Sequence, residues 1–308
     1  MVEMSAPSVL KPDTRDVAVL MPVLKFAGAR GTGEYIFCNG LRDVFKAMGR
    51  HSYVVPYRDW NTPRPNTIDF SFVRKDHSYI SRPDQAAVAW IVYGVADIDV
   101  PALEHCAHVL AASPKIAQAV KANLPGMDVT VMPQSCHGAT MTPDGPATPG
   151  GIVYVANQHT KTLRTGGAMA HAAGLPVEIY GRRWEGTPLE GSVRETGMLG
   201  PRVPEIYRGA DAVLHDHIAI LREDQSLSNR VFDVLACGRP LLSDPIGWCP
   251  DDIADFIGWY TDPESLRTAA EAAQGEAETR RAERRDLARH IHETYSFEAV
   301  ARHVLSVV

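Results

Sequence analysis

The stretch SLSNRVFDVLACGRPLLSD, from Ser226 to Asp244, holds the residues whose types and spacing best fit ligand binding. It reads as a polar loop, a short helix, a glycine stop and a buried strand. Ser228 can cap the helix through its hydroxyl, which leaves the amides of Asn229 and Arg230 and the positive end of the helix dipole facing the loop. An anion such as phosphate is expected at this helix start.

Asp233 lies one turn further along the same helix. At 100° per residue, Val231, Val234 and Leu235 share the face that packs on the sheet, and Asp233 falls nearly opposite. We therefore expect Asp233 to face a groove or solvent. A carboxylate one turn beyond a phosphate site is placed to bond a ribose diol, which indicates a nucleotide. The alternative is a capped surface helix with a solvated aspartate.

Further cations follow two expected strands of the same half. Lys161 and Arg164 come after GIVYVAN, and Arg182 and Arg183 come after VEIYG. At the carboxyl ends of strands they would supply positive charge to a diphosphate leaving group, and the arginine fork suits phosphate oxygens. For each of these residues the alternative is a solvated position on the surface. Among all the cations of this half, Arg230 is the strongest candidate for contact with phosphate.

The run from Tyr180 to Asp244, with IYGRRW, GPRVPEIYRGADAVLHDH and SNRVFDVLACGRPLLSD, resembles the C-terminal domain of GT-B glycosyltransferases. Within these it is most similar to the spore-maturation-protein-like (CgeB-type) group. With AVAWIVYG, CAHVLAASPKIAQAV and VTVMPQS, the resemblance covers most of residues 17–297. It implies transfer of a sugar from a nucleotide-sugar donor to a saccharide, a lipid-linked or a small-molecule acceptor, by two Rossmann-like lobes that face each other across a cleft.

The loop GARGTGEY precedes a helix in the first half and contains Gly31 and Gly33. It departs from G-x-G-x-x-G and no acidic residue ends the next strand, so a nicotinamide cofactor is disfavoured. The resemblance implies that this loop faces the donor diphosphate, whereas a plain tight turn is the alternative. Glu34, at the start of that helix, is the candidate carboxylate of the first lobe.

His215, Asp216 and His217 end the expected strand DAVLH. A His-x-His pair suits a metal, but the further ligands of a zinc site are not evident, so we expect no metal and no cofactor. The resemblance assigns Asp216 and His217 to the donor-sugar side of the cleft.

Many retaining GT-B enzymes carry a glutamate eight residues before the helix carboxylate, and this chain has Gln225 there. We expect retention, in which a departing phosphate oxygen serves as the base. Inversion would instead require Glu34 or His137 to take the proton.

The elements that must position these residues are those of an α/β protein. VAVLMPV and SYVVPY flank a helical pattern from 34 to 48, which predicts a βαβ unit, and AVAWIVYG, HVLAAS and VTVMPQ continue a parallel sheet with a helix at 115–123. GIVYVAN, VEIYG, DAVLH and PLLSD repeat this architecture. The cleft lies at the carboxyl ends of the strands.

The stretch TMTPDGPATPGG is the best linker in the chain because it concentrates proline, glycine and threonine. The expected division is an N-terminal acceptor domain at 1–140 with a loose tail at 1–14, a linker at 141–151, a donor domain at 152–295, and a segment at 296–308 that returns to the first lobe.

The chain has 308 residues, 45% of them hydrophobic and 22% charged, which is enough for two lobes. A net charge of −6 argues against nucleic acid as a partner. Five cysteines without a C-x-x-C pair suit a reducing cytoplasm, and with no signal peptide and no apolar run near 18 residues we expect a cytoplasmic protein that does not span a membrane.

Two other functions use the same donor site. A GT-B-type epimerase would isomerise a nucleotide sugar without an acceptor. A non-catalytic nucleotide-sugar-binding protein is the second alternative, because Gln225 replaces the common glutamate.

Overall fold

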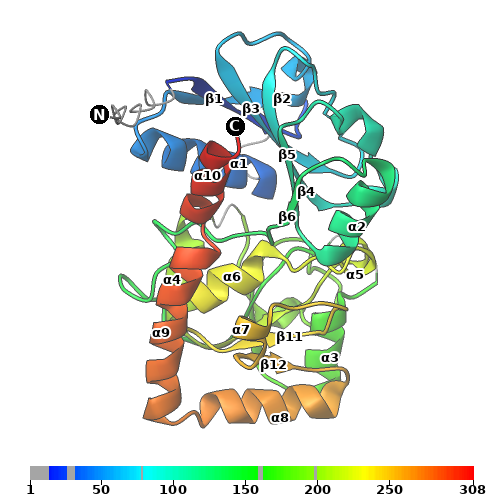
Figure 1. Cartoon of the computed structure of the whole chain (residues 1–308). Coiled ribbons are helices and arrows are strands. Elements are labelled where there is room, and N and C mark those ends of the chain that lie inside the picture. Colours follow the sequence, from blue (N-terminus) through cyan, green and yellow to red (C-terminus); the bar gives the residue numbers. More distant parts are fainter. Residues whose placement is uncertain (1–13, 26–31, 78, 159–161, 198–199) are drawn as a thin grey trace, which may run out of the picture.

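The apolar runs of the first half of the chain form a six-stranded parallel sheet, which is the core of the N-terminal lobe (Figure 1). The computed structural model describes residues 14–25, 32–77, 79–158, 162–197 and 200–308. The predicted βαβ unit is confirmed, since β1 and β2 pair in parallel around α1. The strand order is β2-β1-β3-β4-β5-β6. In chain order the elements are β1 (Asp16–Met21), α1 (Gly33–Ala47), β2 (Ser52–Pro56), β3 (Thr67–Arg74), β4 (Ala86–Tyr93), β5 (His108–Ala111), α2 (Pro114–Asn123) and β6 (Val129–Val131).

Strand β3 lies in the middle of this sheet, and the sequence patterns did not predict it. Its run TIDFSFVR is interrupted by Asp69 and Ser71, which are both fully buried. Asp69 is tolerated there because Arg64 donates to its two carboxylate oxygens at 2.7 and 2.8 Å and the Tyr79 hydroxyl donates at 2.7 Å. A buried charge that is paired in this way is compatible with a central strand.

The second half forms another six-stranded parallel sheet, with the order β12-β11-β10-β7-β8-β9. The four strands that the sequence predicted are present, and β9 and β12 are short strands at the two edges that it missed. The elements are β7 (Gly150–Val155), α3 (Thr165–Ala173), β8 (Val177–Tyr180), β9 (Val193–Glu195), α4 (Val203–Gly209), β10 (Ala210–His215), α5 (Ala219–Glu223), α6 (Asn229–Ala236), β11 (Leu241–Ser243), α7 (Asp251–Ala254), β12 (Ile257–Trp259), α8 (Pro263–Gln274) and α9 (Glu278–Thr294).

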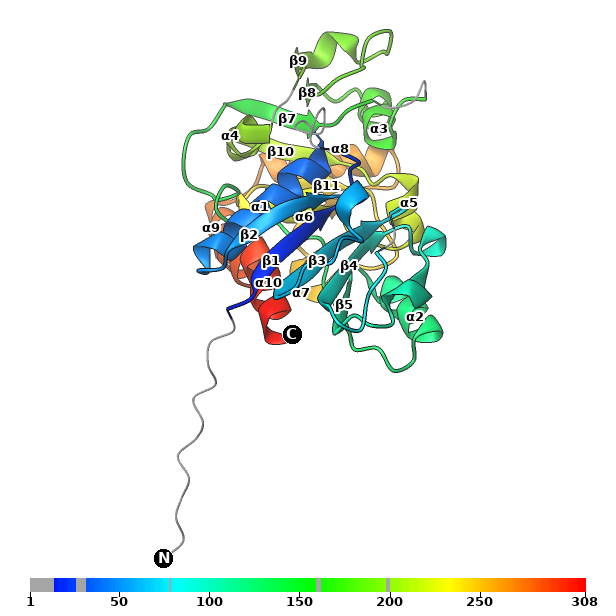
Figure 2. The same cartoon turned by 90° about the horizontal axis from the view of Figure 1, so that it is seen from above.

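The chain passes between the lobes twice, and the two passages lie side by side. Cys136, on the way from β6 to β7, donates its amide to the Tyr295 carbonyl at 2.9 Å and accepts the Phe297 amide at 3.0 Å. After the second passage, α10 (Phe297–Ser306) packs against α1 in the N-terminal lobe (Figures 1 and 2). The ring centroids of Phe297 and Phe37 are 4.5 Å apart, so the last helix belongs to the core of the first lobe.

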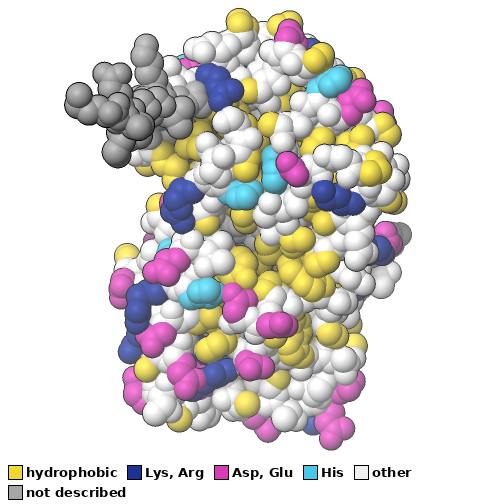
Figure 3. Space-filling model, in the orientation of Figure 1, with side chains coloured by type: hydrophobic (Ala, Val, Ile, Leu, Met, Phe, Trp, Pro, Cys, Tyr) yellow, Lys and Arg dark blue, Asp and Glu magenta, His cyan; other side chains and the backbone are white. Residues whose placement is uncertain are grey.

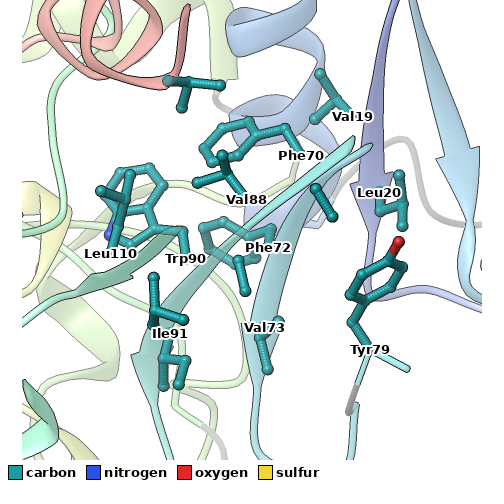
Figure 4. Packing of buried hydrophobic residues seen from close by; sticks show 14 of the residues in the cluster. Val19, Leu20, Phe70, Phe72, Val73, Tyr79, Val88, Trp90, Ile91 and Leu110 are labelled. Carbon is teal, nitrogen blue, oxygen red and sulfur yellow. The ribbon is translucent and has the colours of Figure 1, made fainter. Parts of the chain in front are cut away.

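Aromatic side chains fill that core between the sheet and its helices. Figure 4 shows Phe70, Phe72 and Trp90 lying together among aliphatic side chains. Phe70 and Trp90 stack at 6.1 Å with 16° between their planes, which is the offset arrangement that aromatic pairs favour. These rings come from β3 and β4, so the strand missed by sequence supplies the centre of the core.

The distribution of charged side chains on the surface is consistent with the net charge of −6. On the face drawn in Figure 3, Lys and Arg side chains are scattered instead of forming one patch, and hydrophobic side chains gather around the boundary between the lobes. None of the helices in the described ranges is long and apolar enough to cross a membrane.

The ion pair between Arg64 and Asp69 generates a prediction. Asp69→Ala leaves the Arg64 guanidinium buried without its carboxylate, so we expect a loss of about 3–5 kcal/mol in the free energy of unfolding. Chemical denaturation followed by tryptophan fluorescence measures this. Asp59→Ala is the matched control, because Asp59 pairs with the exposed Arg58 at 3.2 Å. Equal stability of the two variants would contradict the role given to Asp69.

Candidate active site at the lobe boundary

Helix α6 begins as the sequence predicted, and Figure 1 shows it at the boundary with the N-terminal lobe. The Ser228 hydroxyl accepts the Arg230 amide at 3.3 Å, and the Ser228 carbonyl accepts the Val231 amide at 3.0 Å. The face with Val231, Val234 and Leu235 is buried in the core of the C-terminal lobe. The helix start is therefore held rigidly with its positive dipole end at the carboxyl edge of the sheet.

The predicted exposure of Asp233 is wrong. Its side chain is only 6% exposed, because the passage through Cys136 and His137 covers the outer face of α6. Asn229 donates its side-chain amide to the Asp233 carboxylate at 2.9 Å, and the backbone amide of His137 is a second donor. Burial raises the pKa of Asp233 to about 7, although Arg230 and these donors act in the opposite direction.

Arg230 is half-buried and lies beside both Asp233 and His215. Its positive charge opposes the effect of burial on the pKa of Asp233 and adds to that effect on the pKa of His215, and its guanidinium hydrogen-bonds the Tyr207 side chain. Burial raises the pKa of Tyr207, which therefore stays uncharged and leaves the charge of Arg230 uncompensated by that partner. A cation in this position, next to the start of α6, suits an anionic ligand.

Arg164 and Asp216, which sequence reasoning placed separately on the donor, form an ion pair with each other. The shortest contact between the guanidinium and the carboxylate is 2.6 Å, and Arg164 also donates to the Asp216 carbonyl at 3.1 Å. The Tyr154 hydroxyl donates to the same carboxylate at 2.5 Å. Both charges are therefore used within the lobe, where they fix the end of β10 against β7.

His217 is held by two residues to which sequence reasoning gave no role. Its Nδ1 atom and its backbone amide each lie 2.8 Å from one oxygen of Asp244, and Arg222 donates to the other oxygen at 2.6 and 2.9 Å. Burial raises the pKa of Asp244, but the hydrogen bonds from His217 and Arg222 outweigh it, and the pKa is below its usual range. Asp244 follows β11, so its position after a strand next to β10 is the signal that could have found it.

His215 packs edge-on against His217, with ring centroids 4.6 Å apart. Burial, together with the nearby cations, lowers the pKa of His215 well below its usual value, so its ring is neutral. The Nε2 atoms of both histidines are buried and have no hydrogen-bond partner among the described residues. These atoms are available to a ligand or to water.

The first-lobe candidates Glu34 and His137 are both engaged. Glu34 lies 3.4 Å from Arg74 at the carboxyl end of β3. The Nδ1 atom of His137 is 2.9 Å from the Thr140 hydroxyl, and its ring packs edge-on against Phe297. Burial lowers the pKa of His137.

The remaining candidates are distributed as follows. Gly33 opens α1, and space is free around the position of a Cβ atom there. The side chain of Arg182 is exposed after β8, two strands and about 10 Å from β10, so it does not join Arg230. Gly31 and Lys161 lie outside the described residues.

The raised pKa of Asp233 generates a second prediction. Because its folded-state pKa exceeds its unfolded-state value, ionisation is disfavoured in the folded protein, and the resulting loss of stability grows as the pH rises through about 4 to 7. Asp233→Asn removes this penalty. We expect the stability of the variant relative to wild type to rise by about 2–3 kcal/mol from pH 5 to pH 8.

The measurement is chemical denaturation of both proteins at the two pH values. Asp43→Asn, which changes a half-exposed carboxylate on α1, is the control and should show no such trend. Parallel pH dependences of wild type and Asp233→Asn would contradict the assignment.

Comparisons with known proteins bear on the fold and on the C-terminal part of the chain. Residues 164–306 match the family described as "Glycosyl transferase-like". No curated protein sequence matches the chain.

Solved structures of similar fold cover almost the whole chain. They include AviGT4, a glycosyltransferase of avilamycin A biosynthesis (15% identity, TM-score 0.61, 95% of this chain and 96% of that one). Anabaena HepE in complex with UDP-glucose is similar at 10% identity and a TM-score of 0.59, over 95% and 98%. Sucrose-phosphate synthase from Thermosynechococcus elongatus is similar at 13% identity and 0.58, over 94% and 97%. The two parallel-sheet lobes have the GT-B fold of these structures, and the C-terminal part of the chain, residues 164–306, is similar to the glycosyl transferase-like family.

Proposed function

We propose that the protein transfers a glycosyl group from a nucleoside diphosphate sugar held by the C-terminal lobe to an acceptor held by the N-terminal lobe. The observation that carries this proposal is the start of α6, where Ser228, Arg230 and Asp233 combine a capped helix end, a cation and a carboxylate within two turns. This is the arrangement that a phosphate and an adjoining ribose require. The CgeB-type group remains the finer family assignment that we propose.

The diphosphate would lie at the amides of Asn229 and Arg230, with the Arg230 guanidinium on its oxygens. As the sugar–phosphate bond breaks, negative charge grows on the departing phosphate, and a fixed cation and helix dipole stabilise it without a metal. We assign no phosphate contact to Arg164, because its guanidinium is paired with Asp216. Arg182 follows β8, two strands from β10 in the same sheet, so it would reach only a part of the donor away from Arg230, and Gly33 would face the donor from the N-terminal lobe.

Asp233 would accept hydrogen bonds from the ribose hydroxyls. In the ligand-free protein its oxygens are used by Asn229 and by the His137 amide, so a nucleotide has to replace at least one of these donors. The nearby Nε2 atom of His217, whose ring Asp244 fixes, is the group that we expect to meet the donor sugar.

The engagement of Glu34 and His137 supports a retaining reaction. Glu34 is paired with Arg74, and His137 is packed against Phe297, so neither stands as an unpaired base beside α6. In retention the departing phosphate oxygen takes the acceptor proton, and no side-chain base is needed. Analysis of product configuration by NMR tests this point, and an inverted product would overturn it.

A uridine nucleotide is the first donor to test, because HepE, whose fold is similar, was solved with UDP-glucose. A ligand at one hundred times its Kd stabilises a protein by about 2.7 kcal/mol, which thermal unfolding detects. We expect UDP and UDP-glucose to raise the Tm without added metal, with GDP, ADP, dTDP and CMP as comparisons.

Arg230→Ala should weaken UDP binding by about 10- to 100-fold, since a charged hydrogen bond to phosphate is lost. Arg281→Ala, which removes an exposed cation from α9, is the matched control and should bind as wild type does. Titration calorimetry gives both values. Equal affinities for the two variants, or no binding of any nucleotide by wild type, would overturn the donor site.

Turnover separates glycosyl transfer from the other uses of such a site. Isomerisation of the donor in the absence of an acceptor would identify an epimerase. Tight binding without turnover over a broad acceptor panel would identify a binding protein.

A further inference from the structure

The segment Glu223–Ser226, which leads from α5 into the site helix α6, is inserted into the N-terminal lobe. It reaches the carboxyl ends of β4 and β5, far from the place where the chain itself passes between the lobes. This contact is non-covalent, and it joins the loop before the donor site directly to the opposite lobe.

Asp224 makes the central contact. Its carboxylate accepts the backbone amides of Gly94 and Val95, with the second at 3.3 Å, and only 5% of the residue is exposed. A carboxylate buried to this degree needs strong donors, and here both of them belong to the other lobe. Gly94 has a φ of +77°, and a Cβ atom there would lie 2.5 Å from the Cβ atom of Lys75. The turn whose amides bind Asp224 therefore requires glycine at this position.

Further hydrogen bonds beside Asp224 also join the two lobes. The Ser113 hydroxyl donates to the Asp224 carbonyl at 2.5 Å, and the Ser226 hydroxyl donates to the Val92 carbonyl at 2.8 Å. Lys115 donates to the Glu223 carbonyl. Ser113 and Ser226 are fully buried, so water does not compete for these bonds in the closed molecule.

Gln225 lies between the two anchored residues and has a φ of +54°, a conformation that a glutamine adopts only when its surroundings impose it. Its side chain packs against Gly247, in the loop that follows β11 and Asp244. The contacts of Asp224 and Ser226 therefore set the direction in which Gln225 points.

We propose that Asp224 is a positioning residue that holds the C-terminal lobe to the end of β4 as a non-covalent latch, and so couples closure of the cleft between the lobes to the conformation of Gln225 in the loop that leads into α6. When the lobes separate, water replaces the amides of Gly94 and Val95 around the carboxylate, which makes the latch reversible. The catalytic part of this inference rests on the proposed function, whereas the mechanical part does not.

The test compares Asp224→Ala and the isosteric Asp224→Asn with Asp97→Asn. Asp97 lies in the same turn of the N-terminal lobe but pairs with Lys75 at the surface, at 3.4 Å, and is the matched control. Ser226→Ala, which removes one hydroxyl, keeps the test valid if Asp224→Ala does not fold. Hydrogen exchange of the Gly94–Val95 segment and small-angle X-ray scattering are measured without nucleotide.

We expect exchange at Gly94 and Val95 to be about tenfold faster in Asp224→Ala, less so in Asp224→Asn and Ser226→Ala, and unchanged in the control, with α6 protected throughout. The radius of gyration should increase in the same order. Unchanged exchange or an unchanged radius of gyration in the Asp224 variants would overturn the latch, whether or not the protein binds a nucleotide.

With UDP-glucose as the probe, Asp224→Asn should lower kcat by about tenfold while the Kd for UDP stays within about twofold, because the phosphate site lies within one lobe. An unchanged kcat would overturn the positioning role. Failure of wild type to bind UDP would instead count against the proposed donor, and the nucleotide-free measurements would still decide on the latch.

Discussion

The double passage of the chain between its lobes is the constraint on which the rest of the structure depends. Because Cys136 bonds to the residues on either side of Ser296, the two connections form one narrow bridge and not two independent tethers. The bridge covers the outer face of α6 and contributes the His137 amide to Asp233. The environment of the central carboxylate is thus set by the connection between the lobes as much as by its own helix.

The arginines of the C-terminal lobe differ in whether a carboxylate forms a salt bridge with them, and this difference determines which of them can bind an anion. Arg164 and Arg222 are each neutralised by a carboxylate that follows a strand, Asp216 and Asp244 respectively. These pairs hold the strand ends in place and orient His217. Arg230 instead hydrogen-bonds a neutral tyrosine and lies beside Asp233, so its positive charge acts at the start of α6.

Patterns of residue spacing predicted those features of the structure that depend on residues close together in the chain. The Ser228 cap, the apolar face of α6 and most of the strands follow from residue spacing, because each depends on a few neighbouring residues. Strand β3 was not predicted because Asp69 interrupts its apolar pattern, and the partner that makes this burial possible, Arg64, lies on a loop outside the strand. The exposure of Asp233 was misjudged because helical periodicity describes one helix on one sheet, and the bridge that buries this residue comes from elsewhere in the chain. The pairing of Arg164 with Asp216 could not be predicted from residue spacing either, because the two residues are 52 positions apart in the chain.

The position of α10 has a consequence for synthesis of the protein. Val300, Ala301 and Val304 are fully buried in the same core as β1 and α1, so the N-terminal lobe is completed by a helix that is translated after the C-terminal lobe. Domains usually fold in order as they leave the ribosome. Here the nascent N-terminal lobe exposes the apolar groove of α10 throughout translation of the C-terminal lobe. The core of the N-terminal lobe is therefore complete only after the whole C-terminal lobe has been synthesised.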